Sequence, residues 1–149
     1  EVDFGYVGDI VSLNPSVLNN MMSGGYIPII CSLAADATGQ ILNVNADTLA
    51  SEIAVSIGAM KLVILGTVDG VMGDIDDPDT LYSALTVNEV DDLIEKNIIG
   101  GGMLPKLATA LKAIKGGVPR VHIINGTSRD ALLQEVFTND GAGTMIVAA

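Results

Sequence analysis

The chain has 149 residues, of which 49% are hydrophobic, so it is long enough to bury the core of one compact domain. The net charge of -11 excludes a generic nucleic-acid or anionic-membrane surface, because only 7 Lys and Arg stand against 18 acids. We find neither a run of about 18 apolar residues nor a charged-then-apolar leader. We therefore expect a soluble protein with no nucleic acid and no membrane among its partners.

Cys31 is the only cysteine, which excludes an internal disulfide. A reducing compartment is the simplest setting for such a chain, so we expect a cytoplasmic location. Cys31 also lies in the apolar run 27–31, where a cysteine typically behaves as a small buried hydrophobe. The sequence therefore predicts an unreactive core thiol.

The first predicted elements are a strand and a short helix. Partial alternation of apolar residues over 1–13 favours a short strand at a sheet edge or in a hairpin. The pair Asn14-Pro15 is typical of a helix start, and the apolar residues of 17–22 follow at helical spacing until Gly24. Within this helix we expect Met21 and Met22 to fill core space.

A buried strand and a second helix come next. Residues 26–33 form a nearly continuous apolar run, which is typical of a strand that is buried on both faces. Residues 34–43 then indicate a hairpin or excursion at its carboxyl end. Asn45 is a helix cap, and Gly58 ends that helix. One apolar stripe of the helix consists of Ala46, Ala50, Ile53, Ala54 and Ile57.

A second buried strand is predicted over 61–65, and the turn 66–70 lies at its carboxyl end, where ligands collect in α/β sheets. The acidic stretch 74–79 lacks the spacing of a calcium-binding loop, so we interpret it as a solvated loop. The sequence Thr86-Val87-Asn88-Glu89 is a capping box for a helix that runs to Asn97.

Three successive glycines, Gly100, Gly101 and Gly102, precede a helix predicted over 103–115. Glycines let backbone N–H groups approach an anion, and a helix start attracts negative charge. Lys106 adds a full positive charge at the same place. Taken alone, such a run is more often a flexible connector, and it matches neither the Walker spacing nor G-x-G-x-x-G.

The remaining chain completes an alternating pattern. A third strand is predicted over 120–124, where we interpret His122 as a satisfied wall or edge residue rather than a catalyst. Ser128 should cap the next helix, residues 139–143 should form a turn, and 144–147 a last strand. Strands that alternate with helices in this way predict a single-domain three-layer α/β/α sandwich with a mostly parallel central sheet.

Four motifs, at residues 24–28, 43–48, 101–106 and 141–146, occur in the order and spacing of the acetylglutamate kinases of the amino acid kinase family. The chain resembles the carboxy-terminal, nucleotide-binding half of these enzymes over essentially all of residues 1–149. The resemblance implies transfer of the ATP γ-phosphoryl group to the γ-carboxylate of N-acetyl-L-glutamate, a step of arginine biosynthesis. It implies ATP/ADP and N-acetyl-L-glutamate as partners, with Mg²⁺ carried by the nucleotide and no metal ligand from the protein.

Residue roles also follow from the resemblance. It implies that Lys106 neutralises the transferring phosphoryl group, that Asp47 orients catalytic lysines, and that Asn43 binds the amino-acid substrate. On its residues alone, Asp47 is equally an acid that stabilises the first turn of a helix. The nucleotide-binding residues implied by the resemblance are Thr67, Val68, Asp69, Gly70, Val71, Met72, Gly100, Gly101, Gly102 and Met103.

Two departures from the family pattern limit what we expect of this chain. Gly66-Thr67 stands where the family has Thr-Asp, and the family's amino-terminal substrate-binding half has no counterpart in residues 1–149. We therefore expect weak nucleotide binding and negligible turnover from the chain alone. Three alternatives stay open: a non-catalytic nucleotide-binding module, an interaction module, and a kinase for a related acyl amino acid. The oligomeric state is open too, a homo-oligomer included.

Overall fold

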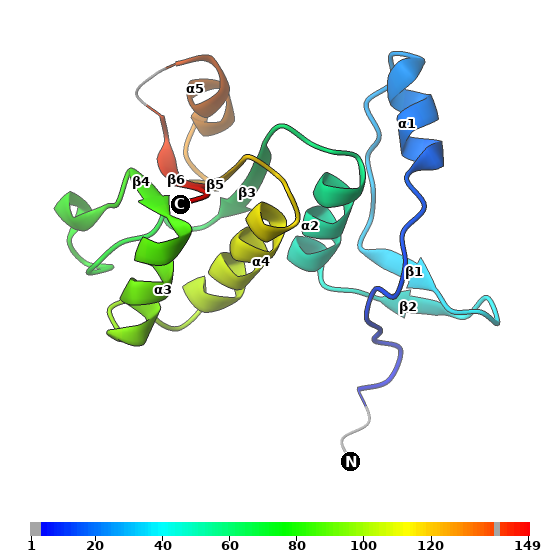
Figure 1. Cartoon of the computed structure of the whole chain (residues 1–149), viewed down its shortest axis with the longest axis horizontal. Helices are drawn as coiled ribbons and strands as arrows, with labels where there is room; N and C mark the ends of the chain where they lie inside the picture. Colours follow the sequence, from blue (N-terminus) through cyan, green and yellow to red (C-terminus); the bar gives the residue numbers. More distant parts are fainter. Residues whose placement is uncertain (1–3, 139–140) are drawn as a thin grey trace.

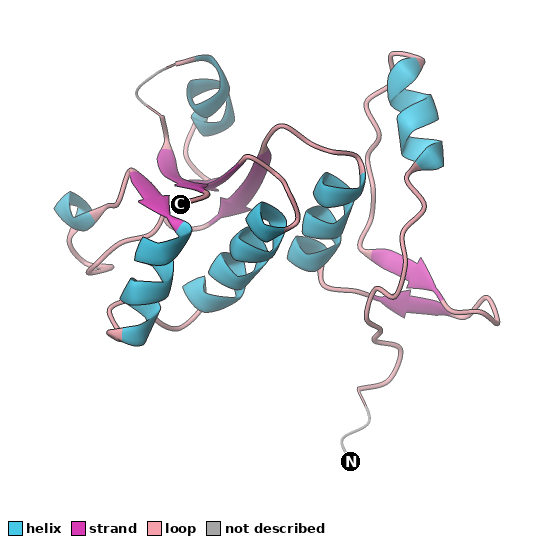
Figure 2. Cartoon of the chain, viewed as in Figure 1, coloured by secondary structure: helices cyan, strands magenta, loops and turns pink. Residues whose placement is uncertain are grey.

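A computed structural model describes residues 4–138 and 141–149 (Figure 1, Figure 2). The helices are α1 (Ser16–Ser23), α2 (Ala46–Ser56), α3 (Val87–Glu95), α4 (Met103–Lys115) and α5 (Ala131–Phe137), with a short 3-10 helix at Pro78–Thr80. The strands are β1 (Leu33–Ala35), β2 (Ile41–Asn43), β3 (Leu62–Gly66), β4 (Ala84–Thr86), β5 (Arg120–Asn125) and β6 (Gly143–Val147).

The central sheet has the strand order β3-β5-β6-β4. The pairs β3/β5 and β4/β6 are parallel and β5/β6 is antiparallel, so the predicted mostly parallel α/β sheet is confirmed. Helices α2, α3 and α4 lie on one side of this sheet and α5 lies on the other (Figure 1). Strands β1 and β2 form a separate antiparallel hairpin, as the sequence predicts for residues 34–43.

The core lies between the sheet and α4. Leu107 is fully buried, and Leu111 and Ile114 are nearly so, which confirms the predicted apolar face of this helix. On β5, the side chains of Val121 and Ile123 join this core, while the intervening His122 contacts Glu135 of α5 on the opposite face. Successive side chains of a strand point to opposite faces, so β5 contacts the core under α4 with one face and α5 with the other.

The predicted side-chain caps form at Asn45 and Thr86. The Asn45 side chain accepts a hydrogen bond from the Thr48 N–H at 2.9 Å, and Thr86 and Glu89 form the predicted capping box. Ser128 does not cap α5. That position belongs to Asp130, whose φ of 58° is left-handed and whose side chain makes no capping hydrogen bond.

The prediction of a buried strand over residues 26–33 is wrong. Only Leu33 belongs to a strand, Ile27 and Ile29 are 88% and 97% exposed, and Cys31 is an exposed thiol instead of a core residue. The segment is extended, but none of the described strands pairs with residues 26–32. An apolar run becomes a buried strand only when neighbouring strands satisfy its backbone.

Two predictions near the amino terminus also fail. Helix α1 forms, yet it buries none of its side chains, and Met21 and Met22 are 40% and 39% exposed instead of filling a core. Described residues 4–13 form no strand and make only an isolated bridge between Val7 and Asn43. The predicted turn at 139–143 lies partly outside the described residues. Across the described ranges, no helix combines the length and apolar character needed to span a membrane.

Candidate active site

Helices α2 and α4 pack side by side and run in the same direction. The Ser51 hydroxyl donates to the Thr109 carbonyl at 3.4 Å, and the next residue of α2, Glu52, has its Oε1 2.5 Å from the Nζ of Lys112, three residues further along α4. Because the contacts advance along both helices together, the two amino-terminal ends lie at the same end of the pair. The positive ends of two helix dipoles therefore face the same region.

Lys106 and Asp47 meet at that end. Lys106 Nζ donates to Asp47 Oδ2 at 3.0 Å, and the side chains are only 23% and 33% exposed. The Lys106 side chain also crosses the carboxyl end of β3, since a β-carbon built on Gly66 would lie 3.7 Å from Lys106 Cε. The structure thus brings together the two residues to which the family resemblance gives catalytic roles.

The glycine loop before α4 is open. No atom outside its immediate neighbours lies within 4 Å of a β-carbon built on Gly100, Gly101 or Gly102. Gly101 has a φ of 58°, a conformation that favours glycine. Helix α4 begins at Met103, so Pro105 lies in its first turn, where the missing N–H costs no hydrogen bond. An anion can therefore approach these backbone N–H groups.

Two adjoining hollows surround the loop. One of about 370 Å³ lies beside Lys106, and the other, of about 340 Å³, continues towards Met72. Gly100, Met103 and Ile75 line both. The first is lined by Thr67, Val68, Ile75, Gly100, Gly102, Met103 and Lys106. The second is lined by Gly70, Met72, Gly73, Asp74, Ile75, Ile98, Ile99, Gly100 and Met103.

Three of the predicted nucleotide-binding residues line neither hollow. Val71 is fully buried and its N–H donates to the Thr144 hydroxyl at 2.8 Å, which makes it part of the fold's framework. The Asp69 carboxylate accepts a hydrogen bond from the Asn125 side chain at 2.8 Å. Gly101 lies in the turn between the two hollows' lining residues Gly100 and Gly102, with a left-handed φ of 58°.

Asn43, predicted to bind the amino-acid substrate, lies at the end of β2 and is exposed. Its backbone N–H donates to the Tyr6 carbonyl at 2.8 Å. Two residues later Asn45 caps α2, so Asn43 lies at the same end of that helix as Asp47. The structure thus leaves its side chain on the surface near the paired helix ends.

Sequence reasoning missed Ile75. We interpreted residues 74–79 only as a solvated loop, yet Ile75 lines both hollows while remaining 64% exposed. One signal was available: Ile75 is the single large apolar residue within that acidic stretch.

On the other face of the sheet, a hollow of about 390 Å³ is lined in part by Lys61, Arg120, His122 and Glu135. His122 is 4% exposed and its Nδ1 lies against the Glu135 carboxylate. Burial lowers the pKa of His122 below 6.5, with Lys61 and Arg120 acting in the same direction against the opposing effect of Glu135. His122 is thus a buried residue on the wall of a different hollow from the one beside Lys106.

The fold and the site define a member of the amino acid kinase family: that family matches residues 1–125, and the chain belongs to it. Among its relatives, the acetylglutamate kinases of Methanocorpusculum labreanum and Methanosarcina mazei are 48% and 46% identical over 100% and 98% of this chain. The chain spans about half the length of these relatives, since it covers 50% of each.

Solved structures agree on the fold. N-acetylglutamate synthase from Neisseria gonorrhoeae, in a complex with coenzyme A and L-arginine, matches 99% of this chain with a TM-score of 0.89 and 33% identity, and the match covers 34% of that protein. Isopentenyl phosphate kinase from T. acidophilum matches 94% of this chain and 56% of that protein at a TM-score of 0.65. At 16% identity, the latter shows a shared fold alone.

Proposed function

We propose that this chain forms the nucleotide-binding portion of a kinase that transfers the ATP γ-phosphoryl group to the γ-carboxylate of N-acetyl-L-glutamate. The observation that carries the proposal is the Lys106–Asp47 pair, 3.0 Å apart at the mouth of the open glycine loop. The 46% and 48% identities to acetylglutamate kinases support the choice of substrate and a place in arginine biosynthesis.

The residues around the loop fit a nucleotide. Phosphates would take the side of the hollow at Lys106 and Gly102, where backbone N–H groups and one ammonium group are available. The apolar wall formed by Ile75, Met103 and Ile98 suits a base and ribose. Phosphoryl transfer depends on positioning and charge stabilisation, and Lys106 would supply the charge while Asp47 holds its ammonium in place.

Mg²⁺ would enter with the nucleotide and neutralise charge on its phosphates. Within residues 4–138 and 141–149, no three His, Cys, Asp or Glu side chains are grouped to hold a metal ion. In the proposal, the ion is therefore held by phosphate oxygens, and Asn43 binds the acetylated amino acid at the neighbouring helix end.

Calorimetry with Mg-ADP tests the nucleotide site. We expect weak binding of Mg-ADP. The Lys106→Met variant should have an affinity about tenfold lower, because one charge-assisted hydrogen bond to the phosphates is lost. Lys112→Met is the matched control, since Lys112 lies on the same helix but pairs with Glu52, away from the glycine loop. Absence of heat at millimolar Mg-ADP, or equal losses in both variants, would contradict the site.

A non-catalytic nucleotide-binding module is the second candidate, and Thr67 favours it. The Thr67 side chain lines the hollow beside Lys106, at a position where the family pattern has an aspartate. An ADP-release assay with N-acetyl-L-glutamate separates the two candidates once the uncovered half of a relative has been joined to the chain. Turnover supports the kinase, whereas binding without turnover supports the module.

A further inference from the structure

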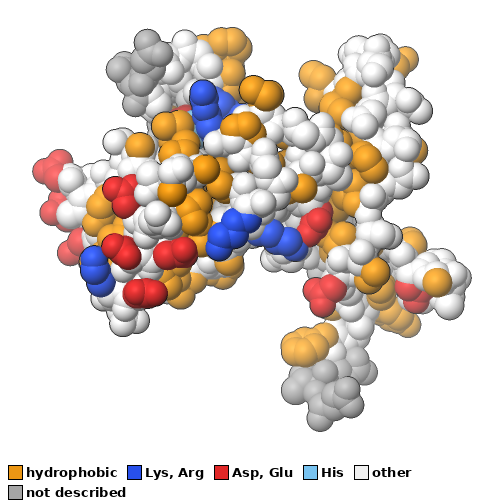
Figure 3. Space-filling view, in the orientation of Figure 1, with side chains coloured by type: hydrophobic (Ala, Val, Ile, Leu, Met, Phe, Trp, Pro, Cys, Tyr) orange, Lys and Arg blue, Asp and Glu red, His pale blue; other side chains and the backbone are white. Residues whose placement is uncertain are grey.

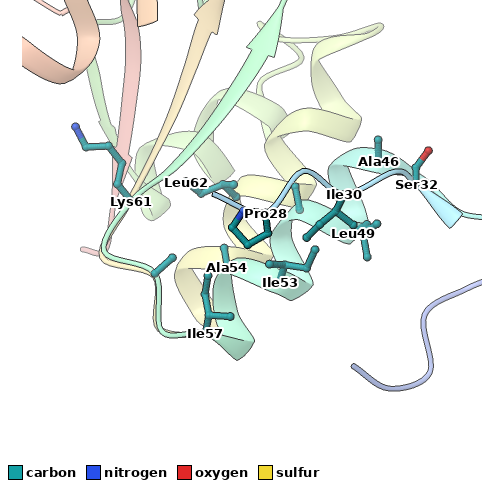
Figure 4. Close-up of a pocket in the computed structure, with 12 residues that line it drawn as sticks. Pro28, Ile30, Ser32, Ala46, Leu49, Ile53, Ala54, Ile57, Lys61 and Leu62 are labelled. Atoms are coloured by element: carbon teal, nitrogen blue, oxygen red, sulfur yellow. The ribbon is translucent and has the colours of Figure 1, made fainter. Parts of the chain in front are cut away.

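Strand β3 and the turn that follows it are held in different ways. At the amino end of the strand, Leu62 is buried and lines the apolar groove against α2 (Figure 4). The strand then pairs with β5 as far as Gly66. Residues 66–72, here named the β3 turn, come next and contribute to both hollows around the glycine loop. The position of the β3 turn therefore shapes the site proposed for the nucleotide.

The inner half of the β3 turn is fixed by β6. The Thr144 hydroxyl accepts a hydrogen bond from the Val71 N–H at 2.8 Å and donates to the Tyr82 carbonyl at 2.6 Å. Val71 and Thr144 are both fully buried. A β-carbon built on Gly143 would lie 2.9 Å from the Asp69 carbonyl oxygen, so the turn rests directly on this strand. Buried contacts of this kind make the inner half part of the core.

The outer half of the β3 turn depends on the loop after β5. Within the described residues, the backbone N–H groups of 67–70 donate to no other residue. The Asn125 side-chain nitrogen donates to the Asp69 carboxylate at 2.8 Å, and the Gly126 N–H donates to the Gly66 carbonyl at 2.9 Å. Asp69 is therefore the side chain through which the outer half is tied to the sheet.

The orientation of the Asn125 amide is set by its other end. The side-chain oxygen of Asn125 accepts from the Thr127 N–H at 2.9 Å and from the Thr127 hydroxyl at 2.7 Å. An amide whose oxygen is occupied in this way presents its NH₂ group in the opposite direction, and that group meets Asp69. The donor is thus in place before the carboxylate arrives.

We infer that Asp69 is a positioning residue. Its hydrogen bond with Asn125 holds the outer half of the β3 turn where Thr67 and Val68 line the hollow beside Lys106. The inference rests on the proposed nucleotide site, but it departs from the family resemblance, which counts Asp69 among the residues that bind the nucleotide. Without the bond, a backbone with no hydrogen bonds of its own shifts, and the hollow changes shape while the fold stays intact.

An exchange of the two side chains separates positioning from direct contact. Asn125→Asp puts two carboxylates face to face, so the affinity for Mg-ADP, measured by calorimetry, should fall about tenfold. Asp69→Asn alone keeps an acceptor oxygen for the Asn125 amide and should lower the affinity by no more than about threefold. In the double variant, amide and carboxylate have changed places and the hydrogen bond re-forms in the reverse direction. Its affinity should return to within about threefold of that of the parent chain.

The cycle also separates geometry from charge. The chain has a net charge of -11, and Figure 3 shows acidic side chains on several parts of the face that it draws, so an added carboxylate repels phosphates in any case. A pure charge effect is additive, so Asp69→Asn would strengthen binding as much in the parent as in Asn125→Asp. Asn20→Asp is the matched control, because it adds the same charge at an exposed position of α1 and should leave the affinity close to that of the parent.

The Gly126 amide reports the bond without nucleotide. Its protection from hydrogen exchange should fall in Asn125→Asp and return in the double variant, while the urea midpoints of all variants stay close to that of the parent. Parent-like affinity in Asn125→Asp would overturn the inference. Equal losses in both single variants with no recovery in the double variant would overturn it too, and would assign Asp69 to direct contact with the nucleotide.

Failure of the proposed function gives a different result. A parent chain that binds no Mg-ADP counts against the nucleotide site itself. Gly126 protection then decides whether Asp69 positions the β3 turn: a fall in Asn125→Asp with recovery in the double variant supports it, and unchanged protection overturns it.

Discussion

Gly116 lies directly against Val55. A β-carbon built on Gly116 would come within 2.5 Å of Val55 Cγ2 and 3.0 Å of Cγ1, at the carboxyl end of the α2–α4 pair. The other end of the same pair carries Asp47 and Lys106. Close approach of the helices at Gly116 therefore helps to set the spacing at which the ion pair forms.

Gly116→Ala should destabilise the chain by about 1–3 kcal/mol, because the added methyl group overpacks the helix contact. Backbone strain is not the reason, since Gly116 has an ordinary φ of -80°. Urea unfolding measures the effect. The double variant Gly116→Ala with Val55→Ala should recover part of the loss, and a single variant as stable as the parent would show that α2 and α4 do not pack this closely.

Local chemistry explains which elements were predictable from sequence. Asn45 and Thr86 cap their helices with their own side chains. The apolar side chains of α4 recur at helical spacing, so the sequence alone shows which face of this helix is buried. The Ser128 prediction failed because the chain enters α5 through the left-handed Asp130 instead. The buried strand predicted over residues 26–33 failed for a different reason: its apolar pattern predicts pairing, and none of the described strands pairs with residues 26–32.

The candidate site was predictable in part. The glycine run and Lys106 are visible as a local pattern, but Asp47 is 59 residues away and only the family resemblance connected the two. Ile75 was missed because its acidic neighbours dominate the composition of that loop. Val71 was placed among nucleotide-binding residues by position in the motif, whereas its burial and bond to Thr144 give it a structural role.

Acid should destabilise the chain through His122. The folded-state pKa of this side chain lies below 6.5, mainly because it is buried, so the unfolded chain takes up a proton first as the pH falls. Stability should be level well above the ordinary histidine pKa of about 6.5 and fall as the pH drops below it, until the folded-state His122 is protonated too. Urea midpoints across this window provide the measurement.

The comparison for that experiment is His122→Gln, which cannot gain a proton. The groups that face His122 are Glu135, which lies against it, and Lys61 and Arg120, which line the same hollow. If stability falls below about pH 6.5 with the same slope in His122→Gln, the pH dependence belongs to another group.

Thr86→Ala should cost about 1 kcal/mol, because it removes the side-chain half of the capping box. The Thr86 hydroxyl accepts from the Glu89 N–H at 3.3 Å and donates to the Glu89 carboxylate at 2.8 Å. Thr86→Ser keeps both bonds and should retain most of the stability in thermal unfolding. Equal losses for Ala and Ser would contradict a capping role.

Gly102→Val should weaken Mg-ADP binding by about tenfold or more while changing stability by no more than about 1 kcal/mol. Gly102 has a φ of -68°, which valine can adopt, and no atom lies within 4 Å of its built β-carbon, so the fold has room for the side chain. The same branches would fill the space that a phosphate needs next to the loop's N–H groups. Ala108→Val adds the same two γ-methyl groups to an exposed position of α4 and should leave binding unchanged. If calorimetry finds undiminished binding in Gly102→Val, the nucleotide does not use the glycine loop, and Lys106 must meet its phosphates from another direction.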